Sequence, residues 1–227
     1  MGRAVKMQPI ILCDFDGTIT TSDNIVAIME QFAPETSAPI KEAVLQGKMA
    51  IKDGVSQMFQ LLETTQKQAI IDFLLDSVQI RAGFEELLAY TTKNAIPFYV
   101  VSGGIDFFVE PILKKFPQID GIYCNGSDFS GKHITVTYPY PCDKKCVNQH
   151  CGCCKPTIMR KLTTADDFVI AIGDSVTDYA LARQADFVFA CDKLLSVCQN
   201  ENLPHQAFTT FYEVVAILEE QRNELQK

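Results

Sequence analysis

The sequence has no run of basic residues and few positive charges altogether: 20 Lys and Arg face 28 Asp and Glu among 227 residues, for a formal net charge of −8. Binding to the phosphate backbone of a nucleic acid requires a basic surface, so we expect no nucleic-acid partner. A negatively charged small molecule would have to find a local positive site. No apolar run is long enough to cross a bilayer, which argues against a membrane protein.

The sequence also lacks a secretion signal, because Met1 to Gln8 has no apolar stretch before a small-residue cleavage site. We therefore expect a cytoplasmic protein. Histidine is scarce, with three residues, and His133 and His205 form no catalytic pattern with a nearby Ser or Cys. We interpret both as structural or surface residues. Hydrophobic residues make up 47% of the chain, which is typical of a globular protein with a sizeable core.

Short apolar runs alternate with helical patterns over much of the chain. The runs are typical of buried parallel strands and cover residues 9–13, 97–101, 168–172 and 187–190. This alternation predicts an α/β protein with a three-layer, Rossmann-like parallel sheet. Ligands of such sheets bind beyond the carboxyl ends of the strands, so Asp14, Ser102 and Asp174 should converge on one crevice.

Two stretches interrupt the alternation. Residues 20–80 carry only helical patterns, which we interpret as a helical cap inserted after the first strand. Residues 121–154 contain an alternating segment from His133 to Tyr138 and then a cysteine-dense loop, which predicts a small hairpin and a Cys-rich insertion. The expected division is therefore a core of residues 1–19 and 81–227 with a cap of residues 20–80.

Asp14 and Asp16 stand directly after the first apolar run, in the sequence Asp-Phe-Asp-Gly-Thr. Residues two apart on extended backbone point to the same side, so both carboxylates can face one site. We expect Asp14 to attack a phosphomonoester and form an aspartyl-phosphate, which divides a very slow hydrolysis into two easier steps. Asp16 would protonate the leaving oxygen and then deprotonate water, which requires a pKa raised by burial or by a nearby carboxylate.

Attack of a carboxylate on a phosphate dianion is unfavourable unless a cation neutralises the charge, and Mg²⁺ suits a site of carboxylate, carbonyl and water ligands. Two further carboxylates follow another predicted strand, in Gly-Asp174-Ser-Val-Thr-Asp178. We expect Asp174 to bind Mg²⁺ together with Asp14 and the backbone carbonyl of Asp16. Asp178 would hold metal-bound water or the loop.

Groups suited to phosphate follow two other predicted elements. Ser102, Gly103 and Gly104 should end a strand and open a helix, which would offer a hydroxyl and free backbone amides to phosphate oxygens. Lys155 precedes a proline suited to the first helical position, and it would face the crevice as a point charge. Each pattern alone is usually a turn, a cap or a solvated loop, but their order along one α/β pattern favours a catalytic site.

Cysteines are dense just before this lysine. Zinc ligands are one interpretation, since reduced cytoplasmic thiols favour zinc over a disulfide, and the candidates are Cys142, Cys146, Cys151, Cys153 and Cys154. Their spacing matches no common zinc finger. A disulfide under oxidising conditions and thiols that merely pack a short loop are the alternatives. Structural zinc would order the loop and thereby position Lys155.

The four segments, in this order, resemble the four motifs of the haloacid dehalogenase-like superfamily, and the second and fourth are most similar to its phosphoserine-phosphatase branch. The resemblance implies a helical cap that closes over the substrate and excludes water. It adds Thr18 of the first motif, and Asp23 where that branch has glutamate, as candidate substrate- or phosphate-binding residues. Residues 47–59 lack the arginine with which that branch holds a substrate carboxylate, so phosphoserine is a poor fit.

A closer resemblance, from Pro9 to Glu220, is to phosphatases of bacterial methionine salvage. It implies an acireductone product, a dihydroxy-ketone with a methylthio tail, and a substrate without ammonium or carboxylate groups. Apolar residues in an arginine-free cap are compatible with such a substrate, and also with a homodimer. The segments that carry this resemblance are residues 14–20, 23–24, 102–108, 151–156 and 173–178.

Other functions remain as alternatives. A phosphatase of another small metabolite would share the whole site. A non-catalytic phospho-acceptor also has an aspartate cluster and a lysine on an α/β sheet, but its acceptor does not stand in Asp-x-Asp-Gly-Thr ahead of a helical cap. A zinc-dependent binding module would leave the order of the motifs unexplained. We therefore predict a Mg²⁺-dependent phosphomonoesterase that acts on a small phosphorylated metabolite.

Overall fold

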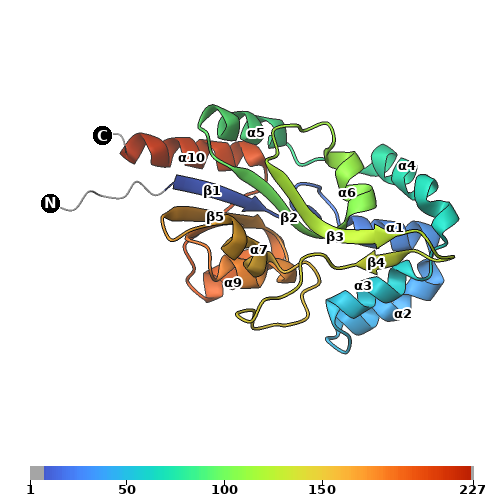
Figure 1. Ribbon diagram of the computed structural model, residues 1–227. Helices are drawn as coiled ribbons and strands as arrows, with labels where there is room; N and C mark the ends of the chain where they lie inside the picture. The colour runs from blue at the N-terminus through green and yellow to red at the C-terminus, as the bar shows by residue number, and fades with distance from the viewer. Residues whose placement is uncertain (1–7, 226–227) are drawn as a thin grey trace.

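The computed structural model describes the backbone of residues 8–225 and the side chains of residues 8–221. The expectation that the sequence lacks a secretion signal concerns residues 1–8, most of which lie outside the described residues. The strands form one seven-stranded sheet in the order β4-β3-β2-β1-β5-β6-β7 (Figure 1). Only β4 runs antiparallel to its neighbour. The strands are β1 (Gln8–Cys13), β2 (Phe98–Ile105), β3 (Gly121–Asp128), β4 (Thr135–Thr137), β5 (Asp167–Gly173), β6 (Phe187–Ala190) and β7 (His205–Ala207).

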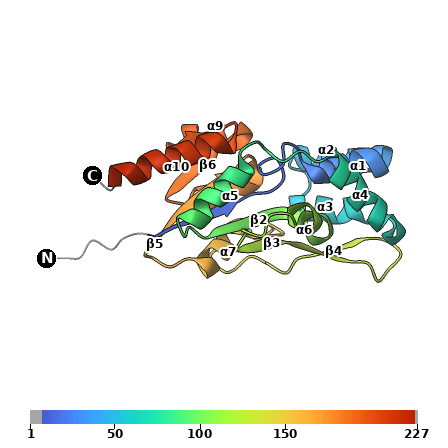
Figure 2. The ribbon, with the colours of Figure 1, turned by 90° about the horizontal axis from the view of Figure 1, so that it is seen from above.

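Helices cover both faces of the sheet, which confirms the predicted three-layer α/β fold (Figures 1 and 2). Strand β1 shows why its run is continuously apolar: Ile11 and Cys13 pack into one hydrophobic cluster, and Ile10 and Leu12 into the other. The first cluster includes α5 (Phe84–Lys93), α6 (Asp106–Leu113) and α10 (Phe211–Leu225). The second includes α7 (Lys155–Leu162), α8 (Tyr179–Ala182) and α9 (Asp192–Asn200).

The segment between β1 and α5 is helical, lies beyond the carboxyl end of β1 and packs against β4 (Figure 1). Its two ends meet, because Thr20 and Ile80 form an isolated antiparallel bridge. Side-chain contacts join the segment to the hairpin, where the hydroxyls of Ser56 and Tyr138 lie 2.6 Å apart. The exact boundaries of core and cap remain a prediction. The helices are α1 (Asn24–Phe32), α2 (Pro34–Leu45), α3 (Ile51–Phe59) and α4 (Lys67–Ser77), with a 3-10 turn at Thr64–Gln66.

Several elements differ from the sequence-based expectation. Strand β2 continues through Ser102, Gly103 and Gly104 to Ile105, so these residues end the strand but do not open the helix, which begins at Asp106. The expected hairpin arm is β3, which also pairs parallel with β2 and belongs to the main sheet. Strand β7 and helix α9 were not predicted from the sequence. No helix among the described residues is long and apolar enough to cross a membrane.

Candidate active site

Three carboxylates gather at the carboxyl ends of β1 and β5. Asp14 follows β1, Asp174 follows β5, and Asp178 ends the 3-10 turn Val176–Asp178. Oxygen atoms of the three side chains lie within 4.8 Å of one another. The convergence follows from the sheet, because β1 and β5 are parallel neighbours and the backbone N–H of Asp14 donates to the carbonyl of Ile172 at 2.9 Å.

Lys155, the first residue of α7, reaches into this cluster. Its Nζ lies 2.7 Å from Oδ1 of Asp14 and 2.6 Å from Oδ1 of Asp178, and its side chain is 2% exposed. Burial alone would lower the pKa of Lys155, but the two carboxylates raise this pKa by more than burial lowers it, so the net shift is upward. The lysine therefore stays charged. Burial and then the charge of Asp178 raise the pKa of Asp14, and the pair with Lys155 opposes that shift.

Asp178 also holds the loop after β5. Its Oδ2 accepts hydrogen bonds from the backbone N–H groups of Asp174 and Ser175, both at 3.1 Å. The hydroxyl of Thr18 donates to Oδ1 of Asp174 at 3.1 Å, which ties the first motif to the fourth. Burial, followed by the charge of Asp178, raises the pKa of Asp174 to about 6.

Asp16 is held by a residue to which sequence reasoning assigned no role. Its Oδ1 accepts from the backbone N–H of Asn24 at 3.0 Å and from the Nδ2 of the same residue at 2.6 Å. Burial, and then the charge of Asp23, raises the pKa of Asp16 to about 7, although the bonds from Asn24 lower it. Asp23 itself caps α1, because its Oδ1 accepts from the N–H of Val26 at 3.0 Å. Substrate binding by Asp23 remains a prediction.

The Ser-Gly-Gly segment lies against the first motif. Ser102 is fully buried, and its hydroxyl accepts from the N–H of Gly104 at 2.9 Å. A Cβ added at Gly104 would stand 2.9 Å from Oδ2 of Asp16, so only glycine allows this close approach. The pairing of β2 with β3 shifts register between Val101 and Ile105, which interrupts the regular ladder at this segment.

Arg81 holds the loop after β1 through its backbone carbonyls, and no sequence pattern had indicated this role of Arg81. Its Nε donates to the carbonyl of Thr18 at 2.7 Å, and its Nη2 donates to the carbonyl of Gly17 at 2.6 Å. Gly17 has φ +78°, and a Cβ there would stand 2.5 Å from Oδ2 of Asp174. The loop can therefore approach Asp174 only with glycine at this position.

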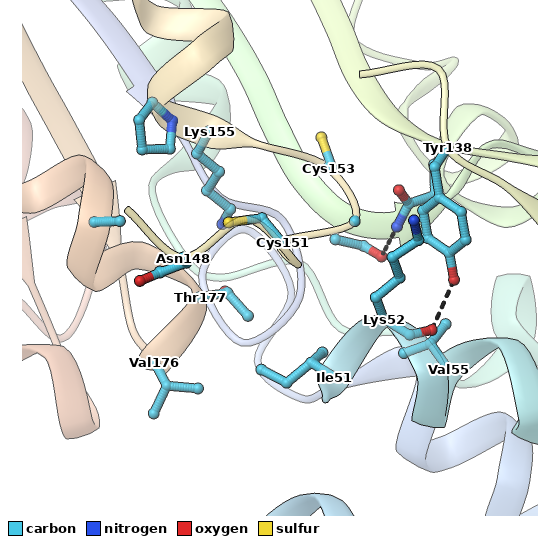
Figure 3. A pocket seen from close by; sticks show the side chains of 15 residues that line it. Ile51, Lys52, Val55, Tyr138, Asn148, Cys151, Cys153, Lys155, Val176 and Thr177 are labelled. Carbon is cyan, nitrogen blue, oxygen red and sulfur yellow. Dashed lines mark hydrogen bonds between the residues drawn. The ribbon is translucent and has the colours of Figure 1, made fainter. Parts of the chain in front are cut away.

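A pocket opens beside Lys155, between α3 and the loop that follows β4 (Figure 3). Lys52 and Tyr138 stand on one side, where the ammonium of Lys52 lies 4.5 Å from the centre of the Tyr138 ring. Asn125 contributes a buried amide whose Nδ2 donates to the carbonyl of Gly103 at 2.7 Å. Its Oδ1 has no hydrogen-bond partner among the described residues. Apolar and loop groups complete the lining, among them Ile51, Val55, Asn148, Cys151, Gly152, Cys153 and Val176.

The chain is similar to known proteins in sequence and in fold. A family model described as haloacid dehalogenase-like hydrolase matches residues 11–183, which is more than half of the chain. The chain belongs to this family. All of the carboxylates described above, and Lys155, lie inside the matched residues.

Two close relatives have the same name. The 2-hydroxy-3-keto-5-methylthiopentenyl-1-phosphate phosphatase of Geobacillus thermodenitrificans (strain NG80-2) is 51% identical over 211 residues, covering 93% of this chain and 96% of that protein. The phosphatase of the same name from Exiguobacterium sibiricum is 52% identical over 206 residues, covering 90% of this chain and 94% of that one. The family resemblance inferred from the motifs is therefore confirmed.

Solved structures share the fold at lower identity. A substrate-bound phosphoserine phosphatase superposes with a TM-score of 0.69 at 20% identity, covering 93% of this chain and 98% of that one. A phospho-aspartyl intermediate analogue of phosphoserine phosphatase gives a TM-score of 0.68 at 19% identity, covering 93% of this chain and 99% of that one. At these identities the likeness concerns the fold.

The carboxylate cluster fits a hard divalent cation. Its three side chains offer only oxygen ligands, the type that Mg²⁺ prefers. Among the described residues, Lys155 alone forms an ion pair with the cluster, so three buried or half-buried carboxylates share one ammonium group. An excess of negative charge in a buried site is costly unless a cation neutralises it.

The cysteines divide into two groups. Sulfur atoms of Cys142, Cys146, Cys151 and Cys154 lie within 4.8 Å of one another. Cys153, which the sequence also suggested as a zinc ligand, is not part of this group, and its thiol approaches the carbonyl of Tyr123 at 3.6 Å. None of the cysteines forms a disulfide within residues 8–225.

Proposed function

We propose that this protein is a Mg²⁺-dependent phosphomonoesterase that hydrolyses 2-hydroxy-3-keto-5-methylthiopentenyl-1-phosphate. The products would be inorganic phosphate and the acireductone 1,2-dihydroxy-3-keto-5-methylthiopentene, as in methionine salvage. The observation that carries the proposal is the buried ion pair of Lys155 with Asp14 inside a cluster of three carboxylates. Relatives about half identical over nine tenths or more of the chain support the choice of substrate.

Asp14 is the proposed nucleophile. One of its carboxylate oxygens forms a bond to phosphorus while the bond between phosphorus and the ester oxygen of the substrate breaks. Lys155 supports this role because its ammonium contacts Oδ1 of Asp14 at 2.7 Å and favours the ionised carboxylate, against the burial that raises the pKa of Asp14. The same positive charge opposes the repulsion between the carboxylate and the phosphate dianion.

Asp16 is the proposed acid and base. It gives its proton to the leaving oxygen in the first step, and in the second step it removes a proton from the water that attacks the aspartyl-phosphate. Its position two residues after the nucleophile and its two hydrogen bonds from Asn24 support this role, because they fix the direction of the carboxylate. A pKa of about 7 suits a group that has to exchange a proton in both directions near neutral pH.

Asp14, Asp174 and Asp178 would hold Mg²⁺, with the backbone carbonyl of Asp16 as a further ligand. When bound, the cation supplies neutralising charge next to the phosphate. Thr18 orients Asp174 through its hydroxyl, and the amides of Asp174 and Ser175 orient Asp178, so each acidic side chain has a fixed direction.

Phosphate and leaving group would be bound by different groups of the site. The hydroxyl of Ser102 accepts from the N–H of Gly104 and can donate its own proton to a phosphate oxygen, and the two glycines after it allow a close approach to the backbone. The unpartnered Oδ1 of Asn125 suits a substrate hydroxyl, and the ammonium of Lys52 suits the keto oxygen.

The test compares kcat/KM for the enol phosphate, generated in situ by the preceding enolase, with values for phosphoserine and pyridoxal phosphate. We expect a preference of about 100-fold or more for the enol phosphate, since buried polar groups left unpaired by a wrong substrate cost that much discrimination. Similar low values for all three would overturn the substrate but keep the reaction class. Turnover of p-nitrophenyl phosphate by an Asp14→Asn variant at the wild-type rate would overturn the reaction class as well.

A further inference from the structure

Four of the nine cysteines are set apart from the rest by their surroundings. Five pack into the two hydrophobic clusters of the protein: Cys13, Cys124, Cys153, Cys191 and Cys198. The other four belong to neither cluster, and all lie in the loop between β4 and α7 or at its end. Packing of the core therefore does not account for them.

We propose that this loop is built around one structural Zn²⁺, bound by the thiolates of Cys142, Cys146, Cys151 and Cys154. Each thiol releases its proton to solvent as its sulfur binds the metal, and no oxidation is involved. The site is distinct from the carboxylate cluster, which offers oxygen ligands only.

The sulfur positions match a tetrahedral thiolate site. With zinc–sulfur bonds of about 2.3 Å, two ligands of a tetrahedron lie about 3.8 Å apart. The sulfurs of Cys146 and Cys151 are 3.7 Å apart, and all four sulfurs fall within 4.8 Å of one another. A disulfide would bring two sulfurs to about 2 Å, and none of the four cysteines is paired in this way. Tetrahedral sulfur sites select zinc or iron, and zinc is the common choice for a closed structural site.

The loop is held so that its two ends bring the ligands together. Arg160 of α7 binds Asp143 through two hydrogen bonds, Nε to Oδ2 at 2.9 Å and Nη2 to Oδ1 at 2.7 Å. The hydroxyl of Thr157 accepts from the N–H of Asp143 at 3.0 Å and donates to the sulfur of Cys154 at 3.0 Å. These bonds fix Cys142, next to Asp143, beside the start of α7.

Two residues that stand between proposed ligands have the left-handed backbone of tight turns. Gln149 has φ +57° and Gly152 has φ +74°, both in the left-handed region. The loop around them is largely exposed, since Lys144, Lys145 and Val147 all face solvent. A surface loop with no hydrophobic core of its own needs another source of order, and a metal site is a common one in small structural units.

The proposed zinc site also borders the catalytic pocket. Asn148, Cys151 and Gly152 line the pocket, and Cys154 directly precedes Lys155 (Figure 3). The loop therefore forms one wall of the pocket and carries the lysine into it. This placement explains why a metal would be kept in a protein whose core is already large.

The test measures metal in the purified full-length protein, prepared with a reductant and without added chelator. We expect about one zinc per chain by elemental analysis, and about four thiols modified by a mercurial for each zinc released. Cys142→Ser and Cys146→Ser should lower the zinc content at least about fivefold. Cys153→Ser is the matched control, because its sulfur lies in the same loop outside the cluster, and it should keep the full zinc content.

Release of zinc from the wild-type protein should also increase hydrogen exchange in residues 141–154, a readout that needs neither substrate nor Mg²⁺. If the serine variants do not fold, this measurement on the wild-type protein decides whether zinc orders the loop. The proposal is overturned by a wild-type protein that contains no zinc or contains iron, by a disulfide among the four cysteines, or by equal zinc loss in Cys153→Ser and Cys142→Ser. The outcome is independent of the proposed substrate, since no turnover is measured.

Discussion

Lys155→Met is the substitution that probes the catalytic cluster most directly. It keeps the length of an unbranched side chain at a position that is 2% exposed, and it removes the charge that pairs with Asp14 at 2.7 Å and Asp178 at 2.6 Å. At an effective dielectric constant of about 20, Coulomb's law gives about 6 kcal/mol of attraction for each pair, most of which offsets the cost of burying the charges. Removing one partner leaves the others buried without compensation, at a cost of about 3–5 kcal/mol.

We therefore expect Lys155→Met to lose about 3–5 kcal/mol of the free energy of unfolding in metal-free buffer, measured by urea denaturation. The midpoint of thermal unfolding should fall by about 10 °C. Mg²⁺ should restore part of the loss, because a cation that binds the native carboxylates stabilises the folded state. In turnover assays with saturating Mg²⁺, kcat should fall by about 100-fold or more, because a charge next to the transferred phosphoryl group is missing.

Lys161→Met is the control for this experiment, since Lys161 lies on the same helix and is exposed. It should change the free energy of unfolding by less than about 0.5 kcal/mol. If the two variants were equally stable without metal, or if Mg²⁺ stabilised neither of them, the carboxylates would not be an uncompensated cluster and the reasoning would be refuted.

Three further predictions concern individual residues of the site. Asp14→Asn should abolish phosphate release while circular dichroism stays unchanged, and excess EDTA should abolish wild-type turnover, with both effects followed by a phosphate assay. Asn24→Ala removes the hydrogen bond from the side-chain Nδ2 to Oδ1 of Asp16, which lowers the pKa of Asp16, and keeps the one from the backbone N–H. The fall in kcat/KM above pH about 7, where Asp16 loses its acidic proton, should therefore move to higher pH; a move to lower pH would contradict this. Lys52→Ala should raise KM for the enol phosphate about 10-fold, because the variant loses one proposed charged contact to the substrate. Lys48 is an exposed lysine of the same segment, so the control variant Lys48→Ala should leave KM unchanged.

The positions of the motifs at the ends of strands could be predicted, because the local sequence indicates where a parallel strand ends. Continuous apolar runs identify β1, β5 and β6, and the residue after the run at β1 or β5 must lie at the carboxyl edge of the sheet. Asp14 and Asp174 were therefore predictable as neighbours although 160 positions separate them. Family membership followed from the same residues.

The apolar pattern failed where it was short or mixed. Strand β3 contains two glycines and several polar residues, and β7 has three residues, so neither shows the period of a strand. The Ser-Gly-Gly segment was expected to end a strand and open a helix, but pairing with β3 continues β2 to Ile105. Strand pairing of this kind is a contact between distant segments, which local propensity does not contain.

The sequence alone determined the α/β class, the carboxylate pair after β1, and the set of five cysteines from which metal ligands could be drawn. Only the tertiary structure decided that Cys153 faces the core while four other sulfurs meet, and that Asn24 and Arg81 hold the first motif. It also brought Lys52 and Tyr138 together at the pocket. The physical reason is the same in each case: spacing along the chain sets which way a side chain points within one element, whereas its partners depend on how separate elements pack.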